Sequence, residues 1–149
     1  MILLGQANLP INNQGQFSLP PKMSAALHPH AFLTQGFDRN LLLMSSETFE
    51  RIYSIIKNTS LSDPLARLLV RLFLANAVEL NIDDSGQIQI PLNLRELVGA
   101  SERIVVVGQG DFFEIWSPIS WEEQTKSIGD YQANIDRFAK YDLAAVRFQ

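Results

Sequence analysis

The sequence lacks several residue classes, and each absence removes a kind of protein from consideration. It has no cysteine, so neither a disulfide framework nor a zinc site with thiolate ligands can form. Its two histidines share one short turn, His28-Pro29-His30. Nucleophilic catalysis therefore has no obvious place for a base beside a separate nucleophile. No nucleophile elbow, phosphate-binding loop or dinucleotide fingerprint is present either. We expect no enzyme and no cofactor.

Long apolar runs and clustered positive charge are missing as well. No stretch reaches the roughly 18 apolar residues needed to cross a bilayer. The start of the chain, residues 1–8, lacks the basic flank and the apolar length of a signal peptide. These features predict a cytoplasmic protein with no membrane partner. The net charge of −4 argues mildly against a nucleic-acid partner. Most of the excess negative charge lies in residues 78–116, which contain seven acidic residues and two arginines.

One ten-residue pattern is present twice. Residues 11–20 and residues 82–91 share apolar positions, a glycine followed by glutamine, and a final proline, at a spacing of 71 (86 minus 15). In each copy the glycine, Gly15 or Gly86, stands in a tight polar loop where positive φ is readily adopted. The repetition indicates a tandem duplication. We therefore expect the function to depend on a pair of these loops.

The order of elements around each loop predicts the same α+β motif in both copies. The motif is strand, loop, strand, short helix and hairpin, and residues 3–44 should superpose on residues 75–116 about a pseudo-two-fold axis. We expect one domain over 1–149, with the first repeat at 3–57, the second at 75–127 and a helical tail at 128–149. Intertwined, two such motifs can close a small β-barrel that hides most strand edges.

The strongest helix prediction falls between the repeats. Asp63 is a suitable N-cap and Pro64 suits the first helical position, ahead of an apolar run that ends near Ala77. The run is apolar nearly all round, and only Arg67 and Arg71 interrupt it. This pattern predicts a helix packed between the two halves, nearly inaccessible apart from its arginines.

These features resemble the MraZ family of bacterial transcriptional regulators, which belong with the AbrB-like, swapped-hairpin DNA-binding folds. The resemblance covers about residues 2–127. It rests on the repeats ending at Pro20 and Pro91, on the helix from Asp63, and on the stretch 107–116. It implies an intertwined β-barrel of two half-repeats assembled into rings. It also implies repression from direct DNA repeats upstream of the division and cell-wall gene cluster, and a location at the nucleoid.

The family's repeat signature, Asp-x-x-x-Arg, is altered here. The matching pairs are Asn12 with Gln16 and Asp83 with Gln87, so neither loop carries positive charge. Arginine offers a charged bidentate fork, whereas glutamine offers one amide that suits adenine. The residues expected to meet DNA are Asn12, Asn13, Gln14, Gly15, Gln16, Asp83, Ser85, Gly86, Gln87, Lys22, Arg67 and Arg71.

Each candidate also has a plainer explanation. Gln16 and Gln87 are base contacts or ordinary polar turn residues, with the two readings evenly balanced. For Arg67 and Arg71 a salt bridge, to Asp63, Glu47 or a neighbouring subunit, is favoured over phosphate contact. An acidic hairpin turn accounts for the pair Asp83 and Asp84 better than a metal site or an acid–base pair. The two histidines fit a surface turn better than a metal site, so we expect no metal.

The leading hypothesis is a sequence-specific DNA-binding regulator without a cofactor. It would act as a homo-oligomeric ring in which loops that bind weakly one by one gain affinity through their number. The alternative is a ring-forming interaction protein that has lost DNA binding and works through protein partners. A small-ligand binder is a more distant third possibility.

Overall fold

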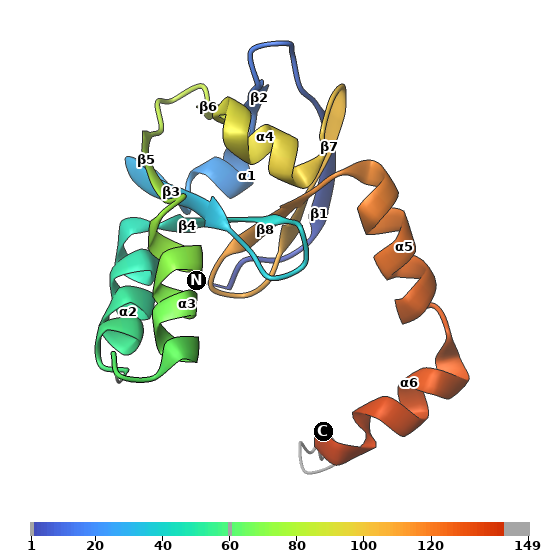
Figure 1. Ribbon diagram of the computed structural model, residues 1–149. Coiled ribbons are helices and arrows are strands. Elements are labelled where there is room, and N and C mark those ends of the chain that lie inside the picture. The colour runs from blue at the N-terminus through green and yellow to red at the C-terminus, as the bar shows by residue number, and fades with distance from the viewer. Residues whose placement is uncertain (1, 60, 142–149) are drawn as a thin grey trace. The chain divides into compact units, whose positions relative to one another are not determined.

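The computed structural model describes residues 2–59 and 61–141 of the 149-residue chain. The chain divides into two compact units, Met1–Pro118 and Ile119–Gln149. In the first unit (Figure 1) the elements follow in the order β1 (Gln6–Pro10), β2 (Gln16–Ser18), α1 (Pro21–Ser24), β3 (His30–Gln35), β4 (Leu41–Ser45), α2 (Ser46–Lys57), α3 (Pro64–Leu74), β5 (Val78–Asn81), β6 (Gln87–Gln89), α4 (Leu92–Val98), β7 (Arg103–Gly108) and β8 (Phe113–Trp116).

The remaining elements are helical. Helix α5 (Pro118–Ile128) begins at the boundary of the two units and is followed by α6 (Tyr131–Phe138) and a short 3₁₀ helix, Ala139–Tyr141. None of their residues is buried. The part of the expected tail that follows Tyr141 lies outside the described residues. Among the residues that are described, no helix has the length and apolar character to cross a membrane.

Two antiparallel sheets make up the first unit. The larger has six strands in the order β1-β7-β8-β4-β3-β5, and the smaller is the pair β2–β6, called the ribbon below. In the larger sheet the counterparts in the two repeats are β1 and β5, β3 and β7, and β4 and β8. Exchanging each strand for its counterpart gives the same strand order in the opposite direction. Each repeat's opening strand pairs with the hairpin of the other repeat, β1 with β7 and β5 with β3. Neither repeat forms this sheet alone.

The register of the strand pairs reflects the duplication directly. In the ribbon, Phe17 lies opposite Ile88, which follows it by 71 residues (88 minus 17). In the larger sheet, Leu42 lies opposite Glu114, which follows it by 72 residues (114 minus 42). Equivalent positions of the two repeats therefore face each other at both places. A two-fold relation between two copies of one motif produces this pattern.

The prediction of a closed barrel is wrong in one respect, because the larger sheet stays open. Within residues 2–59 and 61–141, its edge strands β1 and β5 do not pair with each other, and neither pairs with the ribbon. The reason lies in β2 and β6, which are only three residues long and pair with each other. Their hydrogen-bonding groups form a separate small sheet and leave the larger sheet's edges unjoined.

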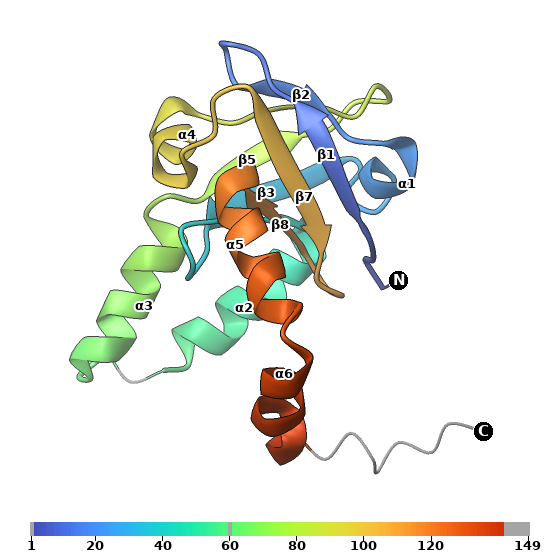
Figure 2. The same ribbon diagram turned by 90° about the vertical axis from the view of Figure 1, so that its right-hand side faces the viewer.

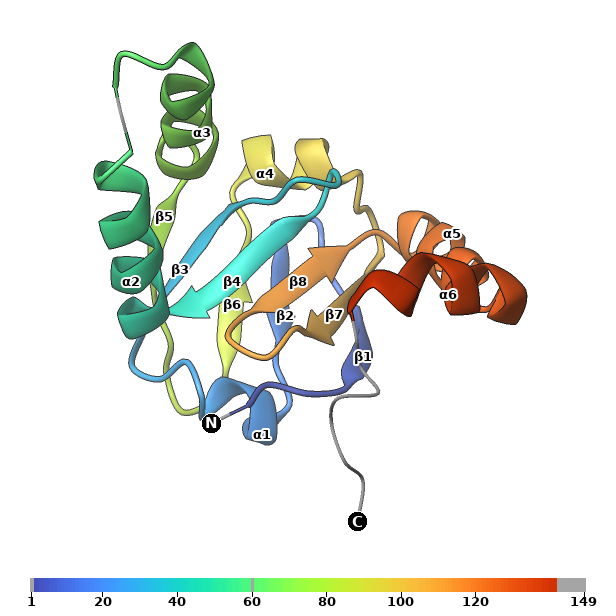
Figure 3. The same cartoon turned by 90° about the horizontal axis from the view of Figure 1, so that it is seen from below.

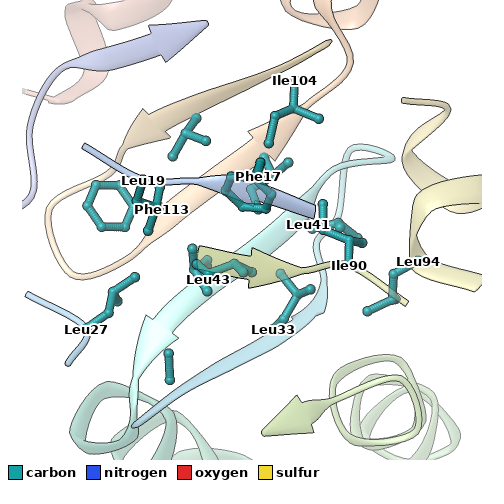
Figure 4. Close-up of a cluster of buried hydrophobic side chains, with 14 of the residues drawn as sticks. Phe17, Leu19, Leu27, Leu33, Leu41, Leu43, Ile90, Leu94, Ile104 and Phe113 are labelled. Atoms are coloured by element: carbon teal, nitrogen blue, oxygen red, sulfur yellow. The ribbon is translucent and has the colours of Figure 1, made fainter. Parts of the chain in front are cut away.

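The main hydrophobic core lies between the ribbon and the larger sheet (Figure 4). Phe17 and Ile88 enter it from the ribbon, where the residues on either side of them are more accessible. Leu43 and Phe113 enter it from the sheet, and Leu94 enters it from α4. The ribbon thus has one face anchored in the core and one face directed outward, as period-2 alternation requires.

Helices α2 and α3 lie side by side, away from the ribbon (Figure 1, Figure 3). They form a second hydrophobic cluster with strands β3 and β4. The rings of Phe32, Phe49 and Phe73 stack in series, with centroid separations of 4.0 and 5.1 Å. The buried hydroxyl of Thr34 on β3 donates a hydrogen bond of 2.6 Å to the carbonyl oxygen of Phe73, which ties α3 to the sheet.

Helix α3 begins as predicted but is packed differently. Asp63 caps it by accepting a hydrogen bond of 2.9 Å from the Leu65 amide, and Pro64 follows. Yet only Ala66 and Phe73 are buried in this helix, and Leu65 is 72% exposed. The prediction of an inaccessible helix between the two halves is therefore wrong. Because α3 rests on α2 and one face of the sheet, its opposite apolar face remains uncovered.

Candidate nucleic-acid interface

The two repeated loops have the same internal geometry. The first loop is residues 12–15 and the second is residues 83–86. In the first, the Asn12 side-chain oxygen accepts hydrogen bonds from the amides of Gln14 (3.0 Å) and Gln16 (2.9 Å). In the second, the Asp83 carboxylate accepts a hydrogen bond of 3.0 Å from the Ser85 amide. Each first residue thus caps its own loop as an Asx turn.

The carboxylate of Asp83 is held in its ionised form. The Ser85 hydroxyl donates to it over 2.5 Å and is the main reason that the pKa of Asp83 lies below its ordinary value of 3.8. Backbone amides of Gln87, Ser85 and Gly86 lower this pKa further. The carboxylate is therefore committed to the loop and retains its negative charge at neutral pH.

The outward face of the ribbon carries the polar residues on either side of Phe17 and Ile88. In the strand register, Gln16 lies opposite Gln89 and Ser18 lies opposite Gln87. Gln16, Ser18 and Gln87 line one surface depression of about 380 Å³, together with Asn12. The structure therefore brings the two glutamines predicted from the repeats, 71 residues apart (87 minus 16), onto a single surface.

Two residues that the sequence did not point to support the first loop. Arg95, on α4, donates from Nη1 to the Asn13 carbonyl oxygen (2.8 Å) and from Nε to the Ile90 carbonyl oxygen (3.0 Å). Gln89, on β6, donates from Nε2 to the Gln14 carbonyl oxygen (3.0 Å). Both side chains come from the second repeat. The first loop, neutral in itself, thus has a guanidinium against its backbone.

The second loop has different surroundings. At a spacing of 71, the position of Arg95 in the first repeat is occupied by Ser24, which lies beside Gly86. His28 approaches this loop, and its Nε2 lies 3.6 Å from a carboxylate oxygen of Asp84. Asp84 is fully exposed. The two loops therefore share a backbone but differ in charge, with the second one acidic.

The other predicted cations lie elsewhere. Lys22, on α1, is exposed and lines a different depression with Leu3 and Leu4. Arg67 donates from Nη1 to the Leu61 carbonyl oxygen over 2.9 Å. Both Arg67 and Arg71 are on α3, which lies away from the ribbon (Figure 2). Neither arginine forms an ion pair within the described part of the chain, so the favoured salt bridge to Asp63 or Glu47 is not formed.

The two histidines point to different partners. His28 approaches Asp84, whereas His30 Nδ1 lies 2.9 Å from the side-chain oxygen of Asn81. In the described ranges, 2–59 and 61–141, no three histidine or acidic side chains are arranged to hold a metal ion. The chemistry available at the ribbon and the first loop is that of amides, hydroxyls and one guanidinium, whereas the second loop adds the carboxylates of Asp83 and Asp84. These groups recognise polar surfaces through hydrogen bonds.

Comparison with known proteins finds relatives along most of the chain. A family model described as "MraZ protein, putative antitoxin-like" matches residues 73–140. A protein named Transcriptional regulator MraZ from Herpetosiphon aurantiacus is 34% identical over 129 residues, which cover 87% of this chain and 90% of the relative. A protein of the same name from Alkaliphilus oremlandii is 33% identical over 122 residues, covering 82% and 85%. Another, from Roseiflexus castenholzii, is 30% identical over 147 residues, covering 99% and 100%.

Proposed function

The chain belongs to the MraZ family, and from this premise we propose that it is a transcriptional regulator that binds double-stranded DNA in a sequence-specific manner. The contact surface is the outward face of the ribbon together with the adjoining loops. One observation carries the proposal. Gln16 and Gln87, equivalent residues of the two repeats, line the same exposed depression on that face. A two-stranded antiparallel ribbon has the width to enter the major groove, where the amide side chains on its outward face can contact DNA.

The fold supports this assignment. A strand order that reads the same when the repeats are exchanged, and equivalent residues paired across β2–β6 and β4–β8, suit an intertwined pair of half-repeats. Proteins of the AbrB-like, swapped-hairpin superfamily are built from two such intertwined half-repeats. We propose that this chain has the same swapped-hairpin fold.

The affinity of one ribbon for DNA should be low. The first loop contributes no cation of its own, and the second contributes Asp83 and Asp84. On duplex DNA the logarithm of affinity falls with the logarithm of salt at about −0.9 per phosphate neutralised. A surface with so few cations should therefore show a shallow dependence on salt.

Self-association compensates for weak single contacts. Residues on α2, on α3 and between them leave large apolar side chains exposed, namely Ile55 (70%), Leu61 (64%), Leu65 (72%) and Leu68 (59%). Exposed apolar surface of this kind marks an interface. We infer a closed ring held by heterologous contacts, in which ribbons bind direct repeats upstream of the division and cell-wall gene cluster at the nucleoid.

A binding assay over a range of salt tests this function. The DNA is the region upstream of the protein's own gene, and the control is a shuffled duplex of the same length and composition. We expect weak binding with a shallow salt slope and a preference for the upstream DNA that persists at physiological salt. Equal affinity for the two duplexes would rule out sequence-specific regulation. A steep salt slope would move the contact surface from the ribbon to the cations of α1 and α3.

The second candidate function is a ring-forming interaction protein that has given up DNA. The acidic second loop favours it, because Asp83 and Asp84 repel phosphate and the loop itself carries no cation. In this case sedimentation would still detect a ring, but the upstream DNA would not bind at any salt concentration. The two measurements together therefore separate the two candidates.

A further inference from the structure

The ribbon end beside the first loop is assembled from both repeats. Gln16 of β2 and Gln89 of β6 lie directly opposite each other, so their side chains leave the same face about 5 Å apart at their β-carbons. Gln89 also binds the first loop through the Gln14 carbonyl oxygen, and Arg95 holds the Asn13 carbonyl oxygen. Three side chains are thus fixed around one short loop.

The corresponding end beside the second loop has no such assembly. At the spacing of 71 residues, Gln89 corresponds to Ser18 and Arg95 corresponds to Ser24. The residue opposite Gln87 is therefore a serine, so this end of the ribbon has no second amide across from Gln87. Asp84 stands where the first loop has Asn13. The two ends of the ribbon have the same backbone but unequal recognition groups.

The orientation of the two amides at the first end follows from their partners. The Asn12 side-chain oxygen accepts from two backbone amides, so its nitrogen must be the atom that faces Gln16. Gln16 must then present its oxygen to Asn12, which leaves its NH₂ group directed elsewhere. Gln89 binds a carbonyl oxygen and must use its NH₂ group for this bond, which leaves its oxygen available.

The neighbouring amides therefore offer one donor and one acceptor. Within the described part of the chain, neither the Gln16 NH₂ group nor the Gln89 side-chain oxygen has a hydrogen-bond partner. In the major groove, adenine presents one acceptor, N7, and one donor, its N6 amino group. Guanine presents two acceptors, N7 and O6. The amide pair matches adenine and leaves the Gln89 oxygen facing another acceptor when the base is guanine.

We propose that Gln16 and Gln89 together read one adenine per subunit, and that the end beside the second loop takes no part in base reading. The proposal rests on the DNA-binding function proposed above and specifies its base preference. The Gln16 NH₂ group donates to adenine N7, and the Gln89 oxygen accepts from the N6 amino group. Arg95 maintains the first loop in position through the Asn13 carbonyl oxygen.

Selection from a pool of random duplexes tests the proposal. The full-length protein is compared with Gln16→Arg, with Gln89→Met and with Gln87→Arg, the matched control at the equivalent position of the other repeat. The native protein should enrich an adenine at one position of each repeated site. Gln16→Arg, which offers two donors, should change that position to guanine, with the preference altered about 10-fold or more. Gln89→Met should lose the adenine preference without gaining guanine, and Gln87→Arg should leave the position unchanged.

Failure of DNA binding and failure of the adenine preference give different results in this experiment. If the native protein enriches no sequence, the DNA-binding function fails and the adenine reading fails with it. If it enriches a motif that Gln16→Arg and Gln89→Met leave unchanged, or one that Gln87→Arg alters equally, the protein binds DNA but the amide pair does not read the base. Circular dichroism and thermal melting of each variant show whether the fold is retained, and all three substitutions lie on the exposed face.

Discussion

Gly15 is at a position where any side chain would meet both backbone and guanidinium. Its φ is +79°. A β-carbon at this position would lie 2.5 Å from the carbonyl oxygen of Ile90 and 2.5 Å from Nε of Arg95. Both distances are too short for a methyl group. Gly15→Ala must therefore both move the chain after β6 and displace Arg95 from the first loop.

The cost of this substitution has two parts. An alanine in the left-handed region costs about 1 kcal/mol. A hydrogen bond from a charged group contributes roughly 1.5–3 kcal/mol, and less where water can replace it. Because Arg95 is partly exposed, we assign about 1 kcal/mol to each of its bonds to Asn13 and Ile90. The expected loss in the free energy of unfolding is about 3 kcal/mol.

Urea denaturation measures this loss, and Gly99→Ala is the matched control. Gly99 ends α4 with a φ of +73°, and a β-carbon there would have no atom within 4 Å. Gly99→Ala should therefore lower the free energy of unfolding only by the cost of an alanine in the left-handed conformation, about 1 kcal/mol. Equal losses for the two variants would refute the steric argument. In an Arg95→Ala background the excess loss of Gly15→Ala should shrink, because the guanidinium is no longer there to be displaced.

Three further outcomes follow from the structure. Thr34→Val should lower the free energy of unfolding by about 1–2 kcal/mol in urea, because it leaves the buried Phe73 carbonyl without its donor. Because the pKa of Asp83 lies below 3.8 in the folded protein, the stabilisation from its carboxylate is present above pH 3.8 and is lost as the pH falls through the lower folded pKa. Asp83→Asn should therefore reduce the drop in melting temperature between about pH 5 and pH 2. An unchanged dependence of the melting temperature on acid would contradict this. If the proposed ring forms through the exposed apolar face of α3, Leu68→Asp should lower the mass found by sedimentation while the monomer keeps its circular dichroism. An unaffected assembly would place the interface elsewhere.

The sequence was sufficient for features that depend on neighbouring residues or on the repeat itself. Asp63 and Pro64 begin a helix because one supplies the cap and the other does not need an amide hydrogen. Gly99 ends α4 in the left-handed conformation. The spacing of 71 identified Phe17 and Ile88 as equivalent residues, whereas their pairing across β2 and β6 is seen only in the structure.

Other features were decided only by the tertiary structure. The apolar pattern of α3 predicted burial but could not say how many faces would be covered, and Leu65 and Leu68 remain exposed. The two intertwined repeats also suggested a closed barrel, whereas the ribbon and the larger sheet remain separate. Arg95 and Gln89 reach the first loop from 82 and 75 residues away. A local pattern records which way a side chain points from its own backbone. Which distant backbone it then meets depends on how the two repeats pair, and that pairing is set by the packing of the whole core.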